Sequence, residues 1–188
     1  HETTREHGLY DGDFLPFAAV WPAVREGYLA WLADYDATGS HFERAEAEGH
    51  TPLGAWQLVG RLDRVDRGAD GQTLVIDYKT ESRQRTADRI KDGAEDTQLA
   101  FYAALLPDDS LRAAYLNVGE RDGTKLYEQQ DVTALRDRLL AGIQSDLQRI
   151  ADGHAMPALG EGSACDWCAA RGLCRRDFWS TPATPGGE

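Results

Sequence analysis

The chain has 188 residues, enough for one domain, and 41% of them are hydrophobic, enough for a sizeable core. No apolar run approaches the ~20 residues of a transmembrane helix, and the polar first stretch shows no signal-peptide pattern. The net charge of −12 argues against a nucleic-acid-binding protein, because contacts to phosphates need Lys and Arg.

The first predicted element is a helix over residues 17–35, in which apolar residues recur at helical spacing. Its apolar face is wide, so we expect it to pack in the core. Pro22 is tolerable only near the start of such a helix.

Two strands are predicted next, over residues 56–67 and 73–80. The turn GADGQ between them makes the pair a β-hairpin. The second strand is apolar on both faces at its start, as buried central strands are. Residues 82–93 are polar and basic, which favours a loop or an exposed helical turn.

The remaining elements are a helix over 96–106, strands over 112–118 and 125–130, and an amphipathic helix over 131–152. This order predicts a mixed α/β (α+β) domain, a small central mixed sheet flanked by helices. We expect residues 1–152 to form the core and the Cys-rich tail, 153–188, to pack on it. The aromatic residues expected to fold the tail onto the core are Trp167, Phe178 and Trp179.

Charged residues end the apolar strand 73–80. Asp77 and Lys79 share one face because strand side chains alternate, and charge at the end of a buried strand is typical of functional sites. The hairpin can bring Asp63 toward Asp77. Two close carboxylates repel unless a cation lies between them, and oxygen ligands suit Mg²⁺ or Mn²⁺. The alternative is a solvated hairpin rim.

The next helix carries Gln98 and Tyr102 one turn apart on one face. Alone, these two would be ordinary surface residues. Their position after the Asp77–Lys79 strand makes them candidates for the same site.

Three cysteines, Cys165, Cys168 and Cys174, cluster near the end of the chain with C-x2-C-x5-C spacing. An odd, clustered set in a cytoplasmic-looking chain indicates metal or cluster ligation rather than disulfides. With His154 the three thiolates would make a Cys₃His zinc set. Three free thiols are the remaining alternative.

Four segments in this order, GRLDRVD, VIDYKT, QLAFYAALL and CDWCAARGLC, resemble the C-terminal nuclease domain of RecB-like and AddB-type helicase–nuclease proteins. These proteins belong to the PD-(D/E)XK superfamily, and the resemblance covers about residues 56–175. The matching residues are Gly60, Asp63, Arg64 and Asp66; Asp77, Tyr78 and Lys79; Gln98 and Tyr102; and the three cysteines.

The resemblance implies a restriction-endonuclease-like core and a metal-dependent DNA nuclease domain. Such a domain would be part of a larger protein of recombinational DNA repair. Its partners would be DNA and a helicase domain or subunit. It would act in the cytoplasm and would not bind a membrane. The only methionine is Met156, so we expect a processed or excised piece of that larger protein.

The resemblance also implies residue roles. Asp63 and Asp77 would ligate Mg²⁺ or Mn²⁺, with the backbone carbonyl of Tyr78 as a candidate third ligand. Lys79 would orient or activate water and stabilise the pentacovalent phosphate, while Gln98 and Tyr102 would support the site and touch the DNA strand. Hydrolysis would follow in-line attack, with metal stabilising the charge.

Members of this family often have a metal-binding histidine on an upstream helix, and the chain departs from that pattern. None of His1, His7 and His41 lies in a recognisable motif. Glu43 and Glu46 are candidate extra acidic groups, with a solvated charge run as the competing interpretation.

The cysteines are a second departure, since they supply three of the four ligands of a [4Fe–4S] cluster. A fourth would have to precede His1 in the full-length protein, and the chain alone is expected to lack an intact cluster.

Two other functions are compatible with the sequence. One is a catalytically inactive scaffold that binds DNA or a helicase partner and carries a Cys-ligated metal or cluster. The other is a small metal-binding protein without a nucleic-acid role, which the charge favours. The presence of Asp63, Asp77 and Lys79 together favours the nuclease.

Overall fold

The computed structural model describes residues 8, 12, 15–91, 93–119, 123–155, 165 and 168–174. The chain divides into two compact units, His1–Ser145 and Asp146–Glu188. No helix in the described part of the chain is long and apolar enough to cross a membrane.

The first unit is built on a five-stranded sheet in the order β1-β2-β3-β4-β5. Only β3 and β4 pair in parallel, and the other neighbours are antiparallel. The pairing of β2 with β3 confirms the predicted hairpin. The strands are β1 (His41–Leu53), β2 (Trp56–Arg67), β3 (Thr73–Lys79), β4 (Arg112–Gly119) and β5 (Gly123–Glu128).

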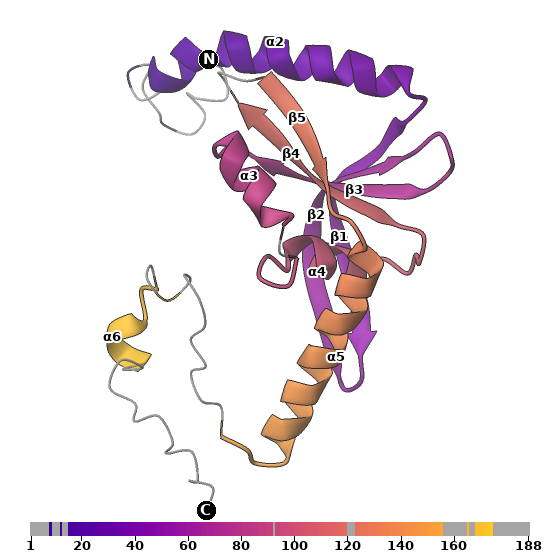
Figure 1. The fold of residues 1–188 in the computed structure, drawn as a ribbon, viewed down its shortest axis with the longest axis vertical. Helices are drawn as coiled ribbons and strands as arrows, with labels where there is room; N and C mark the ends of the chain where they lie inside the picture. The colour runs from indigo at the N-terminus through magenta and orange to yellow at the C-terminus, as the bar shows by residue number, and fades with distance from the viewer. Residues whose placement is uncertain are drawn as a thin grey trace, which may run out of the picture. The chain divides into compact units, whose positions relative to one another are not determined.

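Helices cover the sheet, as Figure 1 shows. Helix α2 contacts β4 and β5, whereas α3 contacts β4, and α4 contacts β2, β3 and β4. This mixed sheet with its helices confirms the predicted fold class. The described helices are α2 (Leu15–Ala37), α3 (Arg83–Arg89), α4 (Gln98–Ala104), α5 (Val132–Ala151) and, in the second unit, α6 (Arg171–Cys174).

The alternation of β3 divides the core into two clusters. Val75 packs with Leu99 and Ala103 of α4, whereas Leu74 and Ile76 pack with residues of the α2 layer. The same alternation turns Asp77 and Lys79 toward the α4 side and Tyr78 toward the α2 side.

Strand β1 was not predicted from the sequence. Nine of its thirteen residues, HFERAEAEGHTPL, are exposed, and the sequence lacks the apolar alternation that marks a half-buried strand. It is instead held by pairing with β2 along its whole length. Glu43 and Glu46 therefore lie on a strand at the edge of the sheet.

Helix α2 corrects two further expectations. It begins at Leu15, so that Pro22 lies inside it rather than at its start. Phe17 and Trp21 are 66% and 59% exposed, which shows that the first half of the helix is not a core element. The second half does pack, through Tyr28, Trp31 and Tyr35.

Gly60 allows β2 to approach the end of α4. A Cβ at this position would lie 2.6 Å from Leu105 Cδ1 and 3.2 Å from Phe101 Cε1. Leu105 is only 3% exposed and has little room to move. Overpacking of this kind costs ~1–3 kcal/mol, so Gly60→Ala should lower the free energy of unfolding in urea by that amount.

Gly142→Ala is the matched control, because a Cβ there, on α5, meets nothing within 4 Å. This change should instead raise stability by ~0.5–1 kcal/mol, since alanine restricts the unfolded chain and favours a helix. A Gly60→Ala variant as stable as the wild type would contradict the assigned packing of β2 on α4.

Candidate active site

Two carboxylates meet across the β2–β3 hairpin. Arg64 lies opposite Ile76, so continuing the antiparallel register by one residue places Asp63 beside Asp77. Asp63 Oδ2 accepts a hydrogen bond of 3.1 Å from the backbone N–H of Tyr78. Asp77 is 2% exposed, a degree of burial that a carboxylate tolerates only with partners.

The oxygens of Asp77 have different partners. Oδ1 accepts a hydrogen bond of 2.7 Å from Gln98 Nε2. Oδ2 is buried and lies 2.5 Å from Lys79 Nζ, but accepts no hydrogen bond of regular geometry from any described residue. Burial raises the pKa of Asp77, the Lys79 ammonium lowers it and the charge of Asp63 raises it again, with a net increase.

Lys79 is held on three sides. Its Nζ pairs with Asp77, donates a hydrogen bond of 2.7 Å to Gln98 Oε1 and lies 4.8 Å from the centre of the Tyr115 ring. Gln98 thus uses its amide oxygen for Lys79 and its amide nitrogen for Asp77. The lysine is oriented by groups that are already in place.

Tyr102 completes the group on α4. Its hydroxyl accepts a hydrogen bond of 3.3 Å from Gln98 Nε2. Burial raises the pKa of Tyr102, and the charges of both Asp77 and Asp63 raise it further. The structure thereby brings together all five residues that the sequence proposed on β2, β3 and α4.

Further residues near Lys79 were not predicted from the sequence. Tyr115 on β4 is 1% exposed, and its hydroxyl donates a hydrogen bond of 2.6 Å to Asp96 Oδ1. Arg89 on α3 then joins Asp96 to Glu81 through ion pairs of 2.6 and 2.5 Å. The only signal was a tyrosine inside the apolar segment RAAYLNV, and nothing local indicated that Tyr115 would lie beside Asp77 in the parallel register.

The other acidic candidates have partners outside this group. Glu43 pairs with Arg67 at 3.0 Å, toward the far end of β2. Glu46 lies on β1 opposite the Asp63 position, in a left-handed conformation with φ of 50°, and its carboxylate pairs with Arg61. His41 is exposed at the start of β1. His1 and His7 lie outside the described residues.

The residues present fit a divalent cation. Within the described ranges, no three His, Cys, Asp or Glu side chains are grouped to hold a metal. Mg²⁺, however, commonly binds through one or two carboxylates and keeps several waters. The interaction between Asp63 and Asp77 that raises the pKa of Asp77, together with the buried Oδ2, is what a cation would relieve.

The cysteines lie in the second unit. Cys165 and Cys174 are half-buried and Cys168 is exposed. His154 is exposed as well. The cluster and the zinc set both remain predictions, and Trp167, Phe178 and Trp179, expected to pack the tail, lie outside the described residues.

This fold and site together define a class of protein, the metal-dependent hydrolases of phosphodiester bonds. In them an Asp-x-Lys sequence on a central strand meets a second carboxylate on the neighbouring strand. The chain belongs to the PD-(D/E)XK nuclease superfamily, whose family model matches residues 2–175. Nucleases of this superfamily typically use Mg²⁺ or Mn²⁺ and act on DNA.

No curated protein sequence matches the chain significantly. Among solved structures, the chain is similar to one described as "Crystal structure of SSO0001", with 18% sequence identity and a TM-score of 0.42. That match covers 86% of this chain and 71% of the other.

The raised pKa of Asp77 predicts a pH-dependent gain from Asp77→Asn in EDTA. Folded Asp77 holds its proton more tightly than unfolded Asp77, so its contribution to stability falls as pH rises from about 4 through the folded pKa. The neutral amide removes this penalty. We expect a higher melting temperature at pH 7, with a gain that shrinks as the pH approaches 4.

Asp70→Asn, at an exposed turn of the same hairpin, controls for the loss of a charge. Adding Mg²⁺ should raise the melting temperature of the wild type but not of Asp77→Asn, because only the former binds the ion. Equal gains for both variants at every pH would show that the Asp77 carboxylate is not destabilised.

Proposed function

We propose that this chain is the nuclease domain of a larger RecB-like or AddB-type helicase–nuclease of DNA repair, and that it hydrolyses DNA phosphodiester bonds. One observation carries the catalytic part of the proposal. Asp63, Asp77 and Lys79 converge at the end of the hairpin, and Gln98 bridges the last two. Membership in the PD-(D/E)XK superfamily supports the reaction class.

Each residue has a role in the proposed reaction. Asp63 and Asp77, with the backbone carbonyl of Tyr78, would hold Mg²⁺ or Mn²⁺, whose charge stabilises the developing negative charge on the phosphate. Lys79 would place its ammonium against a phosphate oxygen and the attacking water. Because Gln98 and Tyr115 already orient Nζ, little reorganisation is needed during the reaction.

The larger context rests on the motifs. The segments GRLDRVD, VIDYKT and QLAFYAALL carry the resemblance to RecB-like and AddB-type proteins, and CDWCAARGLC supplies three thiolates of a [4Fe–4S] cluster. The fourth ligand and the helicase partner would come from the rest of that protein.

The net charge favours a second candidate. With 32 acidic and 20 basic residues, the chain has few cations to neutralise DNA. A catalytically inactive scaffold that docks on a helicase partner would need none.

A cleavage assay separates the two candidates. The intact protein is incubated with end-labelled single-stranded and duplex DNA in Mg²⁺, in Mn²⁺ and in EDTA. A nuclease should release labelled fragments with either metal, stop in EDTA and resume when Mg²⁺ is restored. No cleavage with any divalent ion would reject the nuclease and favour the scaffold.

A further inference from the structure

Asp96, in the segment between α3 and α4, contacts both groups that orient Lys79. Its Oδ1 accepts a hydrogen bond of 2.6 Å from the Tyr115 hydroxyl and one of 3.4 Å from the backbone N–H of Gln98. The Tyr115 ring lies 4.8 Å from Lys79 Nζ, and Gln98 Oε1 accepts a hydrogen bond of 2.7 Å from the same Nζ. One carboxylate oxygen therefore holds both the ring and the amide that contact the lysine.

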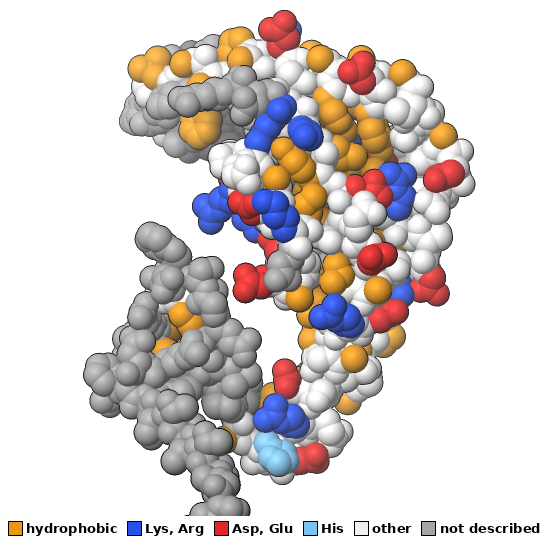
Figure 2. Space-filling view, in the orientation of Figure 1, with side chains coloured by type: hydrophobic (Ala, Val, Ile, Leu, Met, Phe, Trp, Pro, Cys, Tyr) orange, Lys and Arg blue, Asp and Glu red, His pale blue; other side chains and the backbone are white. Residues whose placement is uncertain are grey.

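The second oxygen of Asp96 is held from α3. Oδ2 pairs with Arg89 Nη1 at 2.6 Å, and the Asp96 side chain is only 13% exposed. Arg89 also donates to both carboxylate oxygens of Glu81, at 2.5 and 3.0 Å. Figure 2 shows acidic and basic side chains next to one another over the α3 segment, in agreement with these ion pairs. Asp96 is thus fixed between the sheet on one side and α3 on the other.

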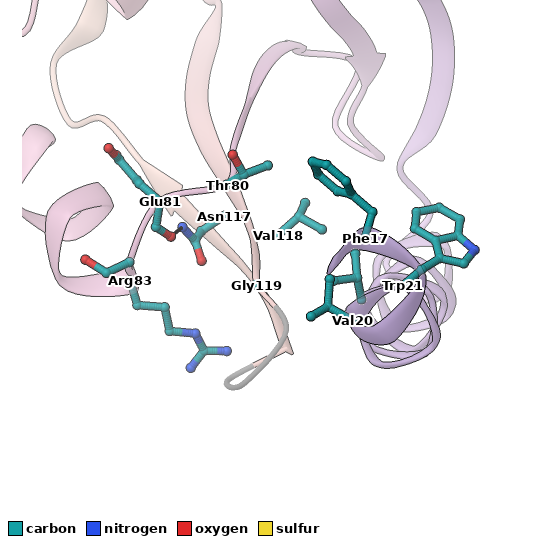
Figure 3. A pocket seen from close by; sticks show the side chains of 11 residues that line it. Phe17, Val20, Trp21, Thr80, Glu81, Arg83, Asn117, Val118 and Gly119 are labelled. Carbon is teal, nitrogen blue, oxygen red and sulfur yellow. Dashed lines mark hydrogen bonds between the residues drawn. The ribbon is translucent and has the colours of Figure 1, made fainter. Parts of the chain in front are cut away.

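Glu81 joins this group to the strand that carries Lys79. It lies two residues after Lys79, and the fully buried Asn117 of β4 donates a hydrogen bond of 2.8 Å to its backbone carbonyl. Asn117 donates a second, also of 2.8 Å, to Thr86 Oγ1, which in turn donates to Glu81 Oε1 at 3.3 Å. Figure 3 shows Glu81 and Asn117 side by side where β3 and β4 end. The contacts therefore form a closed loop that leaves β3 at Lys79 and returns just after it at Glu81, and connected polar networks of this kind make a site rigid.

The ionisation of the two central groups strengthens their contact. Burial raises the pKa of Tyr115, and the hydrogen bond to the charged Asp96 raises it further, so the hydroxyl remains a donor. Burial also raises the pKa of Asp96, but the Tyr115 hydroxyl and the Arg89 guanidinium lower it more, so the net change is a decrease. The carboxylate therefore stays charged, and hydrogen bonds to a charged acceptor are about twice as strong as neutral ones.

Resting on the proposed function, we propose that Asp96 is a positioning residue for Lys79. It acts through the two groups that touch the ammonium, the Tyr115 ring and the Gln98 amide. Asp77 also contacts Nζ, at 2.5 Å, but in the proposed reaction it shares its charge with the cation. The ring and the amide then set the direction of the ammonium group. Supporting groups around a metal site typically contribute ~10–100-fold to activity.

The orientation of Lys79 can be measured directly, because the chain contains only three lysines, Lys79, Lys91 and Lys125. NMR of the full chain with isotope-labelled lysine, in EDTA, therefore gives three sets of side-chain signals, each assigned by replacing one lysine with arginine. The ε-methylene protons of Lys79 should lie upfield of those of Lys91, because Lys79 Nζ lies over the Tyr115 ring, whose π electrons shield protons above it. The Lys91 side chain is 66% exposed and gives the unshifted reference.

Asp96→Ala should move the Lys79 signal toward that of Lys91, because it frees the ring and the amide. The Lys125 signal should stay in place. Asp108→Ala is the matched control, since Asp108 also accepts three hydrogen bonds, of 2.7, 2.9 and 2.8 Å. One of them comes from the first residue of β3, at the opposite end of the strand from Lys79. Both variants should lower the melting temperature, whereas only Asp96→Ala should move the Lys79 signal.

Cleavage by the intact protein shows whether this orientation matters for the reaction. At saturating DNA and Mg²⁺, Asp96→Ala should lower turnover ~10–100-fold, while the Kd for DNA in EDTA stays unchanged. Asp108→Ala should cut DNA like the wild type. Tyr115→Phe, which keeps the ring and removes only the hydroxyl, should lower turnover as well, and it is the milder variant if Asp96→Ala does not fold. The double variant should be no slower than Asp96→Ala alone, because the hydroxyl acts through that carboxylate.

The outcomes separate this inference from the proposed function. An unmoved Lys79 signal in a folded Asp96→Ala variant, or wild-type turnover by Tyr115→Phe, would overturn the inference even if DNA is cleaved. So would an equal movement of the Lys125 signal or equal effects of Asp108→Ala, since these would indicate a general loosening of the fold. A moved Lys79 signal in a protein that cuts no DNA with any divalent ion would confirm that Asp96 positions the lysine and reject the nuclease function.

Discussion

Asp77→Ala and Lys79→Ala should each abolish measurable DNA cleavage while leaving the fold and most DNA binding in place. Lys79 acts on charge that develops in the transition state, and removal of one such contact costs ~10²–10³-fold in turnover. Asp77→Ala should cost more, because it removes the cation as well as one carboxylate. Turnover should therefore fall far more than affinity.

These variants are compared by cleavage rate at saturating DNA, by Kd in EDTA and by thermal melting. Lys125→Ala is a close control for Lys79→Ala. Its Nζ also lies over a tyrosine ring, 5.0 Å from the centre of Tyr127, but Lys125 is the exposed residue of the otherwise half-buried strand β5. Lys125→Ala should cut DNA like the wild type. If Lys79→Ala does so too, Lys79 has no catalytic role.

The central part of this site could be predicted because it depends on local patterns. Alternation along 73–80 places Asp77 and Lys79 on one face, and the short turn fixes Asp63 opposite them. The i, i+4 spacing of Gln98 and Tyr102 fixes their common face on α4. Only the orientation of α4 over β3 required the folded chain.

The parts that could not be predicted depend on contacts between distant segments. Strand β1 carries no apolar alternation because its neighbour β2, not a core, stabilises it. Tyr115 lies near Lys79 only because β3 and β4 are parallel neighbours in the sheet, although α3 and α4 separate them along the chain. The exposure of Phe17 depends on where the sheet ends beneath α2, which no periodicity along the helix reveals.

On the other side of the sheet from Lys79, a buried ion pair supports the same hairpin. Arg64 is 4% and Asp66 0% exposed, and Arg64 Nε donates to both carboxylate oxygens at 2.8 and 3.0 Å. Arg64 Nη1 also donates to the hydroxyls of Tyr28, at 3.0 Å, and Tyr78, at 3.4 Å. The pair thus ties β2 to α2 and to β3.

Tyr78 connects this pair to the candidate active site. Its hydroxyl is held by Arg64 on the α2 side, while its backbone N–H donates to Asp63 on the other. Any change that frees the Tyr78 side chain should therefore loosen the hydrogen bond that holds Asp63. Within the GRLDRVD segment, Arg64 and Asp66 therefore have a structural role. Their side chains do not face the carboxylates of Asp63 and Asp77.

Arg64→Met should lower the free energy of unfolding by ~3–5 kcal/mol, because it leaves the Asp66 charge buried without its partner. Urea unfolding of the metal-free domain measures the loss. Arg61→Met, on the same strand, is the control, since its ion pair with Glu46 is 64% and 60% exposed and such surface pairs contribute only ~0–1 kcal/mol.

The double variant Arg64→Met/Asp66→Leu should recover most of the lost stability, because replacing both charges by apolar side chains removes the unpaired group. That variant also keeps the prediction testable if the single one fails to fold. Its cleavage rate should nevertheless stay below that of the wild type, since it lacks the guanidinium that holds Tyr78. Wild-type cleavage by the double variant would show that Asp63 needs no support from the α2 side. A single variant as stable as Arg61→Met would show that the Asp66 charge is compensated by other groups.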